Sequence, residues 1–377
     1  MICKKCASPM AVILRKKDHY CENCFILSTN HKFRACIGKN KVLSPNENVL
    51  ICLSGGVGSA VLLDLVHHGI SLENNKKLRI VPHFIHLFDD NVPEVSDAIL
   101  KKCQKYNFDI YFVHLSDYLN NNTQLPEVNQ IVALKEDDKI KFTRLLNCMP
   151  STAANDYLLK VKRHLFIKYA KQLNCSAIFT AETTNTLAIN LLCNLAIGRG
   201  SQVQNDVGFC DVRDEKVKIL RPMKDISKEE LDYYVKIKKL VSITRTNVKS
   251  NSLQSAISSF VSDLQQNFQS TISTVCKTAD KIGDYEEDKA SGKCVICKSA
   301  LFTKDMKLSA LEATNISKTV SLGNMNFQQD LENNSELLNI LENNSNNSMF
   351  PLINKYLCYG CSRNHSEMSK PELLQIG

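Results

Sequence analysis

Between residues 49 and 220, short apolar runs alternate with longer mixed segments, and this pattern constrains the fold more than any other feature. Val49–Leu53 is a continuous apolar run that predicts a buried strand, and Ser59–His68 predicts the helix after it. Further strands are predicted at 80–87, 109–115, 176–180 and 217–220, and further helices at 95–106, 127–147, 155–173, 187–197 and 251–267. This alternation indicates an α/β fold: a doubly wound parallel sheet that binds ligands at the carboxyl ends of its strands.

A loop rich in serine and glycine follows the first predicted strand. Residues 54–59 have the sequence Ser-Gly-Gly-Val-Gly-Ser, which matches neither the Walker A loop nor the dinucleotide fingerprint. Gly55 and Gly56 would let the backbone approach an anion closely, and the amino end of the next helix would point at the same place. Ser54 and Ser59 would add two hydroxyl groups. The loop is therefore a candidate anion site, although these residues could also form only a tight turn.

Cysteines occur as four Cys-x-x-Cys pairs, two at the start of the chain and two near its end. The pairs are Cys3 and Cys6, Cys21 and Cys24, Cys294 and Cys297, Cys358 and Cys361. Each pair fits a tight turn that directs two sulfur atoms at one tetrahedral ion, so two pairs make one zinc ribbon. We expect structural zinc at both ends of the chain, the alternative being free or redox-active thiols.

Composition divides the chain into three predicted parts. Residues 1–42 form a basic zinc-ribbon head that is too short to bury a core of its own and depends on its metal. Residues 43–245 form the α/β domain. Residues 246–377 form a helical region with the second ribbon, which closes around an insertion at about 302–350. Ten asparagines between Asn315 and Asn347 predict that this insertion is disordered.

Positive charge is concentrated in the head. The whole chain has a formal net charge of +8, and residues 1–42 contain nine Lys and Arg residues against two acidic ones. Such a patch attracts polyanions and predicts nucleic-acid binding, the alternative being a solvated surface. The candidate nucleic-acid-binding residues are Lys4, Lys5, Arg15, Lys16, Lys17, Lys32 and Arg34. No apolar run is long enough for a membrane span and no signal peptide is present, so we expect a cytoplasmic protein without a membrane partner.

The loop at 54–59 resembles the PP-loop of the ATP pyrophosphatases. The order of motifs along the chain further resembles the PP-loop subunits that thiolate tRNA in the cytoplasm. The segments that carry this resemblance are the four cysteine pairs, 32–39, 54–59, 180–183, 191–194, 198–200 and 221–222. The resemblance implies a PP-loop fold and a role in placing sulfur on C2 of the wobble uridine, U34, of tRNA. It also implies a heterodimer with a sister PP-loop subunit and sulfur from a thiocarboxylated ubiquitin-related modifier.

The chain departs from active members of this family at two places. Gly58 stands where the active motif has an aspartate, and residues 150–154 lack the Cys-x-x-Cys that the thiolating enzymes carry there. We therefore expect no catalytic residue in this chain, and we count ATP only as an optional ligand of a degenerate loop. The favoured hypothesis is a non-catalytic or weakly catalytic subunit of the tRNA-thiolating complex. The alternatives are an autonomous ATP-dependent tRNA-modifying enzyme and a zinc-dependent scaffold protein.

Overall fold

The computed structural model describes residues 2–9, 12–15, 18–73, 77–89, 93–120, 124–131, 136–241, 251–268, 270–282, 292–301 and 356–374. These residues fall into two compact units, Met1–Asp284 and Tyr285–Gly377. The boundaries predicted at residues 42 and 245 stay predictions. The asparagine-rich insertion lies outside the described residues.

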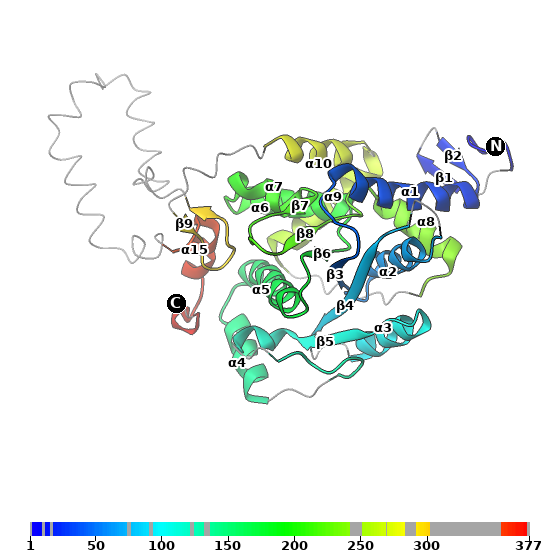
Figure 1. Cartoon of the computed structure of the whole chain (residues 1–377). Helices are drawn as coiled ribbons and strands as arrows, with labels where there is room; N and C mark the ends of the chain where they lie inside the picture. Colours follow the sequence, from blue (N-terminus) through cyan, green and yellow to red (C-terminus); the bar gives the residue numbers. More distant parts are fainter. Residues whose placement is uncertain are drawn as a thin grey trace, which may run out of the picture. The chain divides into compact units, whose positions relative to one another are not determined.

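The first unit is built on a six-stranded sheet with the order β5-β4-β3-β6-β8-β7 (Figure 1). Its strands are β3 (Glu47–Cys52), β4 (Ile80–Phe88), β5 (Ile110–His114), β6 (Ala177–Phe179), β7 (Cys210–Asp211) and β8 (Lys218–Leu220). All neighbouring strands are parallel except β7, which pairs with β8 in the antiparallel sense. The α/β fold expected from the sequence is confirmed, and β7 adds one antiparallel edge strand.

Helices cover both faces of this sheet. They are α1 (Glu22–Asn40), α2 (Val57–Ile70), α3 (Pro93–Lys105), α4 (Glu136–Asn147), α5 (Ser151–Gln172), α6 (Thr184–Ala196), α7 (Val203–Val207), α8 (Lys228–Lys238), α9 (Leu253–Asn267) and α10 (Thr271–Ile282), with short 3-10 turns η1 (Leu115–Leu119) and η2 (Gly200–Gln202). Val49 and Ile51 of β3 belong to the core shared with α1, α2, α3 and α8. Leu50 is equally buried and points to the opposite face, where α5 packs against β3 and β6.

The predicted helix at 127–147 begins later than expected. Val128 pairs with Tyr111 of β5 in an isolated antiparallel bridge, and Asn129 has a φ of 60°. The Asn129 side chain also accepts a hydrogen bond from the backbone N–H of Ile110 at 3.1 Å. These contacts attach the segment to the edge of the sheet, so that the helix of this region is α4 from Glu136.

Half of the predicted head is a long helix that the sequence reasoning did not anticipate. A two-stranded hairpin, β1 (Val12–Arg15) and β2 (Asp18–Tyr20), precedes α1. Phe25, Phe33 and Ile37 of α1 are buried in the main core of the sheet. The segment therefore gains stability from the body of the protein as well as from any metal it binds.

The carboxyl-terminal helices of the first unit cover α6 and α7. The predicted helix at 251–267 is confirmed as α9, which packs Val261 against Ala188 of α6. The helix α10 was not predicted, and its Ala279 packs on Leu187 and Leu191. In the second unit, β9 (Gly292–Lys293) and β10 (Ala300–Leu301) form a short hairpin, followed by α15 (Tyr359–Ser366) and η4 (Pro371–Leu373).

Candidate nucleotide loop and metal centres

The serine-glycine loop joins the carboxyl end of β3 to the start of α2, as predicted from the sequence. Gly55 has a φ of +83°, and a Cβ atom there would lie 2.3 Å from Cγ1 of Val95 in α3. Both the left-handed conformation and the close packing require glycine at this position. Gly56 has an extended conformation at the amino end of α2, and a Cβ atom there would meet nothing closer than Ser54 Oγ at 3.8 Å.

The two serines of the loop differ in exposure. Ser59 is buried, and its hydroxyl donates to the carbonyl oxygen of Gly56 at 2.9 Å. Ser54 is exposed. The start of the loop is fixed from β4, where Nδ1 of the buried His86 donates to the carbonyl oxygen of Leu53 at 2.7 Å. Ser59 thus stabilises the turn itself, whereas Ser54 is available to a ligand.

Gly58 lies against the segment that follows β6. A Cβ atom at Gly58 would lie 2.9 Å from the carbonyl oxygen of Ala181 and 3.5 Å from its Cβ atom. A contact this short with a backbone oxygen requires one of the two segments to move. Any side chain at the position that carries aspartate in the active PP-loop motif would require this rearrangement.

The acidic residue next to Ala181 in the sequence is Glu182, and its carboxylate already has hydrogen-bond partners. Arg221 donates from Nε to this carboxylate at 2.8 Å, and the hydroxyl of Thr180 donates to it at 2.8 Å. A second guanidinium nitrogen of Arg221 donates to the carbonyl oxygen of Gly208 at 2.9 Å. The pair holds together the chain segments that follow β6 and β8.

Cysteines outside the four pairs do not converge on the loop. Cys148 donates to the carbonyl oxygen of Leu145 at 2.9 Å, and Cys276 donates to that of Thr184 at 3.3 Å. Among the described residues, the groups of three or more possible metal ligands are the two that the pairs form. The structure offers no third set of thiols, in its described part, for a persulfide relay.

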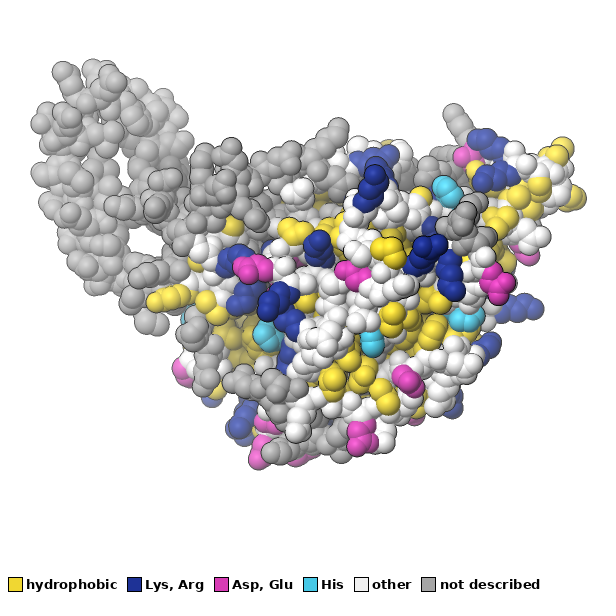
Figure 2. All heavy atoms as spheres, in the orientation of Figure 1, with side chains coloured by type: hydrophobic (Ala, Val, Ile, Leu, Met, Phe, Trp, Pro, Cys, Tyr) yellow, Lys and Arg dark blue, Asp and Glu magenta, His cyan; other side chains and the backbone are white. Residues whose placement is uncertain are grey.

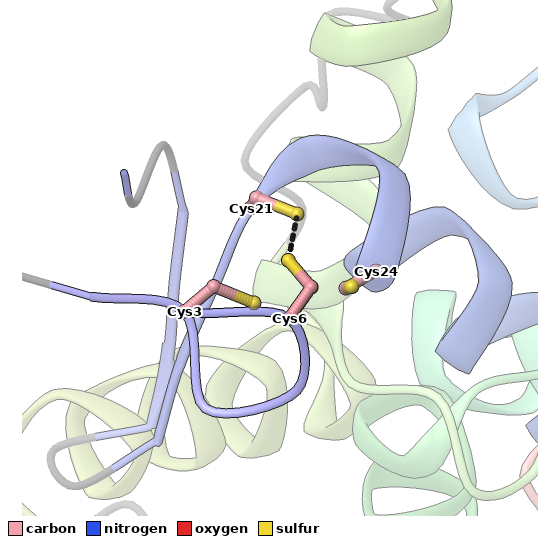
Figure 3. A group of neighbouring side chains, drawn as sticks. All are labelled: Cys3, Cys6, Cys21 and Cys24. Atoms are coloured by element: carbon pink, nitrogen blue, oxygen red, sulfur yellow. Dashed lines mark hydrogen bonds between the residues drawn. The ribbon is translucent and has the colours of Figure 1, made fainter. Parts of the chain in front are cut away.

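The amino-terminal cysteine pairs meet at one point (Figure 3). Cys3 and Cys6 lie on a tight turn, Cys21 precedes α1, and Cys24 lies in the first turn of that helix. The four sulfur atoms lie within 4.8 Å of one another, and those of Cys6 and Cys21 are 3.5 Å apart. The structure therefore brings these four residues together in one group, as the sequence predicts.

Hydrogen bonds shift the pKa values of three of these four thiols, in different directions. A hydrogen bond from the backbone of Cys21 lowers the pKa of Cys3 to about 6, and one from the backbone of Cys24 lowers the pKa of Cys21. Hydrogen bonds with the thiols of Cys6 and Cys21 raise the pKa of Cys24 to about 12. Backbone N–H groups thus stabilise some thiolates while neighbouring thiols share the remaining protons, and a bound cation would displace those protons.

The carboxyl-terminal pairs form a second group within the second unit. Cys294, Cys297, Cys358 and Cys361 also lie within 4.8 Å of one another, with 3.6 Å between the sulfur atoms of Cys297 and Cys358. The backbone N–H of Val295 donates to the carbonyl oxygen of Tyr356 at 2.9 Å. The group joins chain segments that lie some sixty residues apart, as the sequence predicts.

Both groups fit a single tetrahedral ion. Four thiolates around one zinc ion lie about 3.8 Å apart, because each Zn–S bond is about 2.3 Å. The sulfur atoms of Cys6 and Cys21 are 3.5 Å apart and those of Cys297 and Cys358 are 3.6 Å apart, in agreement with this spacing. A four-iron cube holds its cysteine sulfurs farther apart, since each binds a different iron. Both four-cysteine groups are therefore compatible with a structural metal ion.

The predicted tRNA-binding residues of the head are in several environments. Lys4 pairs with Asp18 at 2.6 Å, and Lys32 pairs with Glu230 of α8. Lys5 is exposed and Arg34 is half-buried. The side chains of the remaining three, Arg15, Lys16 and Lys17, lie outside the described part of the structure. A role of these residues in tRNA binding stays a prediction.

Sequence reasoning missed a buried network of charged side chains beside β8. Asp211 accepts from Nε of Arg163 at 2.8 Å and from Nε of Arg213 at 2.9 Å. Asp156 accepts two hydrogen bonds of 2.7 Å each from Arg199. Asp211 and Arg163 are 48 residues apart in the sequence, and Asp156 and Arg199 are 43 apart. No local pattern could have paired them.

A parallel α/β sheet with a Ser-Gly-Gly loop between its central strand and the next helix defines a protein of the PP-loop class. The structure is similar to that of the U34-tRNA thiolase NcsA from Methanococcus maripaludis, which was solved with its [4Fe-4S] cluster. The TM-score is 0.58 at 20% sequence identity, and the match covers 78% of this chain and 92% of that one. At this identity the likeness concerns the fold.

Sequence relatives give the family. Residues 252–363 match the family model of cytoplasmic tRNA 2-thiolation protein 2. The protein of that name from Aedes aegypti is 32% identical in an alignment 359 positions long, which covers 85% of this chain and 80% of the relative. The one from Danio rerio is 30% identical over 381 residues, with 85% and 76% covered. The chain belongs to the cytoplasmic tRNA 2-thiolation protein 2 family and so has a role in tRNA 2-thiolation.

The family name also confirms the cytoplasmic location expected from the sequence. None of the helices within the described ranges is long and apolar enough to cross a membrane.

Proposed function

We propose that this chain is a non-catalytic subunit of the machinery that places sulfur on the wobble uridine, U34, of tRNA. Its partner is an active PP-loop sister subunit, with which it forms a heterodimer. The sister activates the C2 oxygen of the uridine by adenylation and receives sulfur from a thiocarboxylated ubiquitin-related modifier. This chain shapes the heterodimer and holds part of the tRNA.

The observation that carries this proposal is the contact between Gly58 and Ala181. A Cβ atom at Gly58 would lie 2.9 Å from the carbonyl oxygen of Ala181, so the missing aspartate would also force the loop away from the segment after β6. An aspartate in this loop would be needed to hold the magnesium ion of a bound nucleotide. The loop keeps the backbone form of a nucleotide cradle without the carboxylate that activates the nucleotide.

Two further observations support a non-catalytic role. The Glu182 carboxylate, the acid nearest along the chain to the Gly58 contact, forms an ion pair with Arg221 and is not a free metal ligand. Cys148 and Cys276 hydrogen-bond to separate parts of the backbone and belong to no group of converging thiols in the described chain. Adenylation and sulfur transfer would therefore both depend on the sister subunit.

In this proposal the metal of both four-cysteine groups is zinc, in a structural role. Closed sites of four thiolates leave no coordination position for a substrate. The amino-terminal zinc fixes the turn of Cys3 and Cys6 against the start of α1, and so holds the basic head on the body. The exposed and half-buried cations of that head then contact tRNA phosphates.

Matched substitutions in the two subunits test this proposal. Ser54→Ala in this chain should leave most wobble 2-thiouridine in place, because Ser54 serves a loop that does not turn over ATP. The same change at the matching serine of the sister should abolish it. Thiouridine in purified tRNA, measured by mass spectrometry in cells that carry each variant, gives the comparison. Equal losses from the two substitutions would reveal a working nucleotide site in this chain.

A further inference from the structure

Exposed lysines lie at the carboxyl end of α8, outside the basic head that the sequence predicts to bind tRNA. They are Lys236, Lys238 and Lys239. No ion pair joins any of the three to a carboxylate within the described ranges, whereas Lys32 and Lys168 are each paired with an acidic residue. Within the described ranges, no neighbouring carboxylate therefore neutralises the positive charge of these three exposed lysines.

Two neighbouring helices extend this positive charge. Burial lowers the pKa of His68 at the end of α2, and the charges of Lys238 and Arg34 lower it further, against the opposing effect of Asp64. The helix α1, which carries Arg34, also packs against α8, so its charge adds to the field of the α8 lysines. Figure 2 shows Lys and Arg side chains gathered over the region where Figure 1 draws α8 and α2.

This surface adjoins the basic head. The strand β1 of the head lies beside α8, and Phe25 at the start of α1 makes an edge-to-face contact with Tyr233 of α8, with ring centroids 6.3 Å apart. The fold thus brings α8 next to a segment that lies about two hundred residues earlier in the sequence.

The backbone conformation of Lys239 indicates that stabilising the end of α8 does not account for all three lysines. Lysines in a last helical turn interact favourably with the helix dipole, which accounts for Lys236 and Lys238. Lys239, however, has a φ of 50° and a ψ of 41°. Glycine adopts this left-handed conformation at lower cost than any residue with a side chain. Lysine at this position therefore sacrifices some stability and keeps a charge.

We propose that Lys236, Lys238 and Lys239, together with Arg34, form the second half of an RNA-binding surface that begins on the head. The ligand is the phosphate backbone of an RNA, because lysines bind phosphates as point charges and the cluster presents no fixed hydrogen-bonding pattern that would read bases. The identity of this RNA as substrate tRNA rests on the proposed function. An acidic protein segment is the competing ligand, which the experiment separates.

The test is the salt dependence of tRNA binding by the full-length chain. The variant K236A/K238A/K239A is compared with K101A/K105A/K141A, which removes the same charge from exposed lysines of α3 and α4. Each lost phosphate contact lowers the slope of log affinity against log salt by about one, so the α8 variant should lose about two to three from its slope. It should also bind at least about tenfold more weakly at low salt, with the control unchanged.

Lys239→Gly gives a second readout. If Lys239 binds phosphate, this substitution should raise the midpoint of thermal unfolding while it lowers tRNA affinity. A higher midpoint with unchanged affinity, or equal slopes for the two triple variants, would overturn the proposal. So would an α8 variant that keeps its RNA slope but loses a protein partner. If the wild-type chain and its heterodimer bind no tRNA at all, the tRNA-holding role in the proposed function fails as well.

Discussion

Among single residues, the three glycines of the loop are glycine for different reasons. Gly55 requires both a positive φ and the absence of a side chain next to Val95, whereas Gly58 requires only the space against Ala181. Gly56 requires neither. Two of the three thus preserve the shape of the loop, which is why the motif stays visible in the sequence although its aspartate is absent.

Gly55→Ala should therefore destabilise the fold far more than Gly56→Ala. The left-handed conformation costs about 1–2 kcal/mol for alanine, and the overlap with Val95 adds about 1–3 kcal/mol. Gly56→Ala, which meets no neighbour, should cost about 1 kcal/mol or less, mainly through poorer capping of α2. The midpoint of urea unfolding for the two variants measures the difference. Equal midpoints would show that the contact with Val95 does not exist.

Asp211 should contribute to the pH dependence of stability. Burial by itself would raise the pKa of Asp211, but the guanidinium groups of Arg213 and Arg163 outweigh it and hold the pKa well below its usual range. Because the pKa is lower in the folded chain than in the unfolded one, the carboxylate stabilises the fold above pH about 4, and this contribution is lost as the pH falls.

Asp211→Asn should lower the free energy of unfolding at neutral pH by about 3–5 kcal/mol, because the half-buried Arg163 loses this carboxylate and the buried Arg213 loses it too and keeps Asp206. It should also reduce the loss of stability as the pH falls below about 4, because the missing carboxylate no longer contributes to that loss. Unfolding curves at a series of pH values measure both effects. A variant that loses stability in acid as steeply as the wild type would contradict this account of Asp211.

On the scale of whole elements, polar contacts inside the core fix α1, α2 and α8 together. The hydroxyl of the buried Tyr234 in α8 donates to Asp64 of α2 at 2.7 Å and lies 3.3 Å from the side-chain oxygen of Asn30 in α1. Tyr106, just after α3, donates to the same carboxylate at 3.0 Å. The carboxylate of Asp64 in α2 thus joins α8 and the segment after α3, and α1 is linked to them through Tyr234.

Tyr234→Phe should cost about 1–3 kcal/mol of stability, because it leaves Asp64 with one donor fewer in a buried site. The neighbouring Tyr233 is the matched control, since it is only half-buried and packs through its ring on Phe25. Tyr233→Phe should therefore change the unfolding free energy by less than about 0.5 kcal/mol. If the two substitutions have the same effect, the hydroxyl of Tyr234 does not join these helices.

An element could be predicted from the sequence where its apolar residues form a clear local pattern, and it was missed where they do not. The strand β3 and the helix α2 were predicted because their apolar residues are nearly continuous. The helix α1 was missed because its buried Phe25 and Phe33 are separated by polar residues and adjoin a metal motif. The helix α8 had a usable signal in Ser227 and Glu230, whose reciprocal hydrogen bonds form a capping box.

Some candidate sites could likewise be predicted from local sequence patterns, and others could not. Both four-cysteine groups could be predicted because the four ligands of one ion are recognisable from local spacing. The contact of Gly58 with Ala181, the pairing of Asp211 with Arg163 and the lysines of α8 could not, since each depends on segments brought together only by the fold.

On the scale of the whole molecule, each of the two compact units holds one four-cysteine group. The purified chain should therefore carry two zinc ions. Cys21→Ser should remove one of them, and Cys358→Ser the other, because three thiolates bind zinc much more weakly than four. Cys210→Ser, outside both groups, should keep two. Elemental analysis by mass spectrometry measures the metal content. Iron in place of zinc, or one ion shared by all eight thiols, would refute this partition.

The most direct test of the central claim uses the purified full-length chain with ATP, magnesium and unmodified tRNA, first alone and then with its sister subunit. The measured quantities are pyrophosphate release and 2-thiouridine formation in the presence of the sulfur carrier. The account predicts neither product from the chain alone and both from the heterodimer. Pyrophosphate or 2-thiouridine produced by the isolated chain, and lost on Ser54→Ala, would contradict a non-catalytic role.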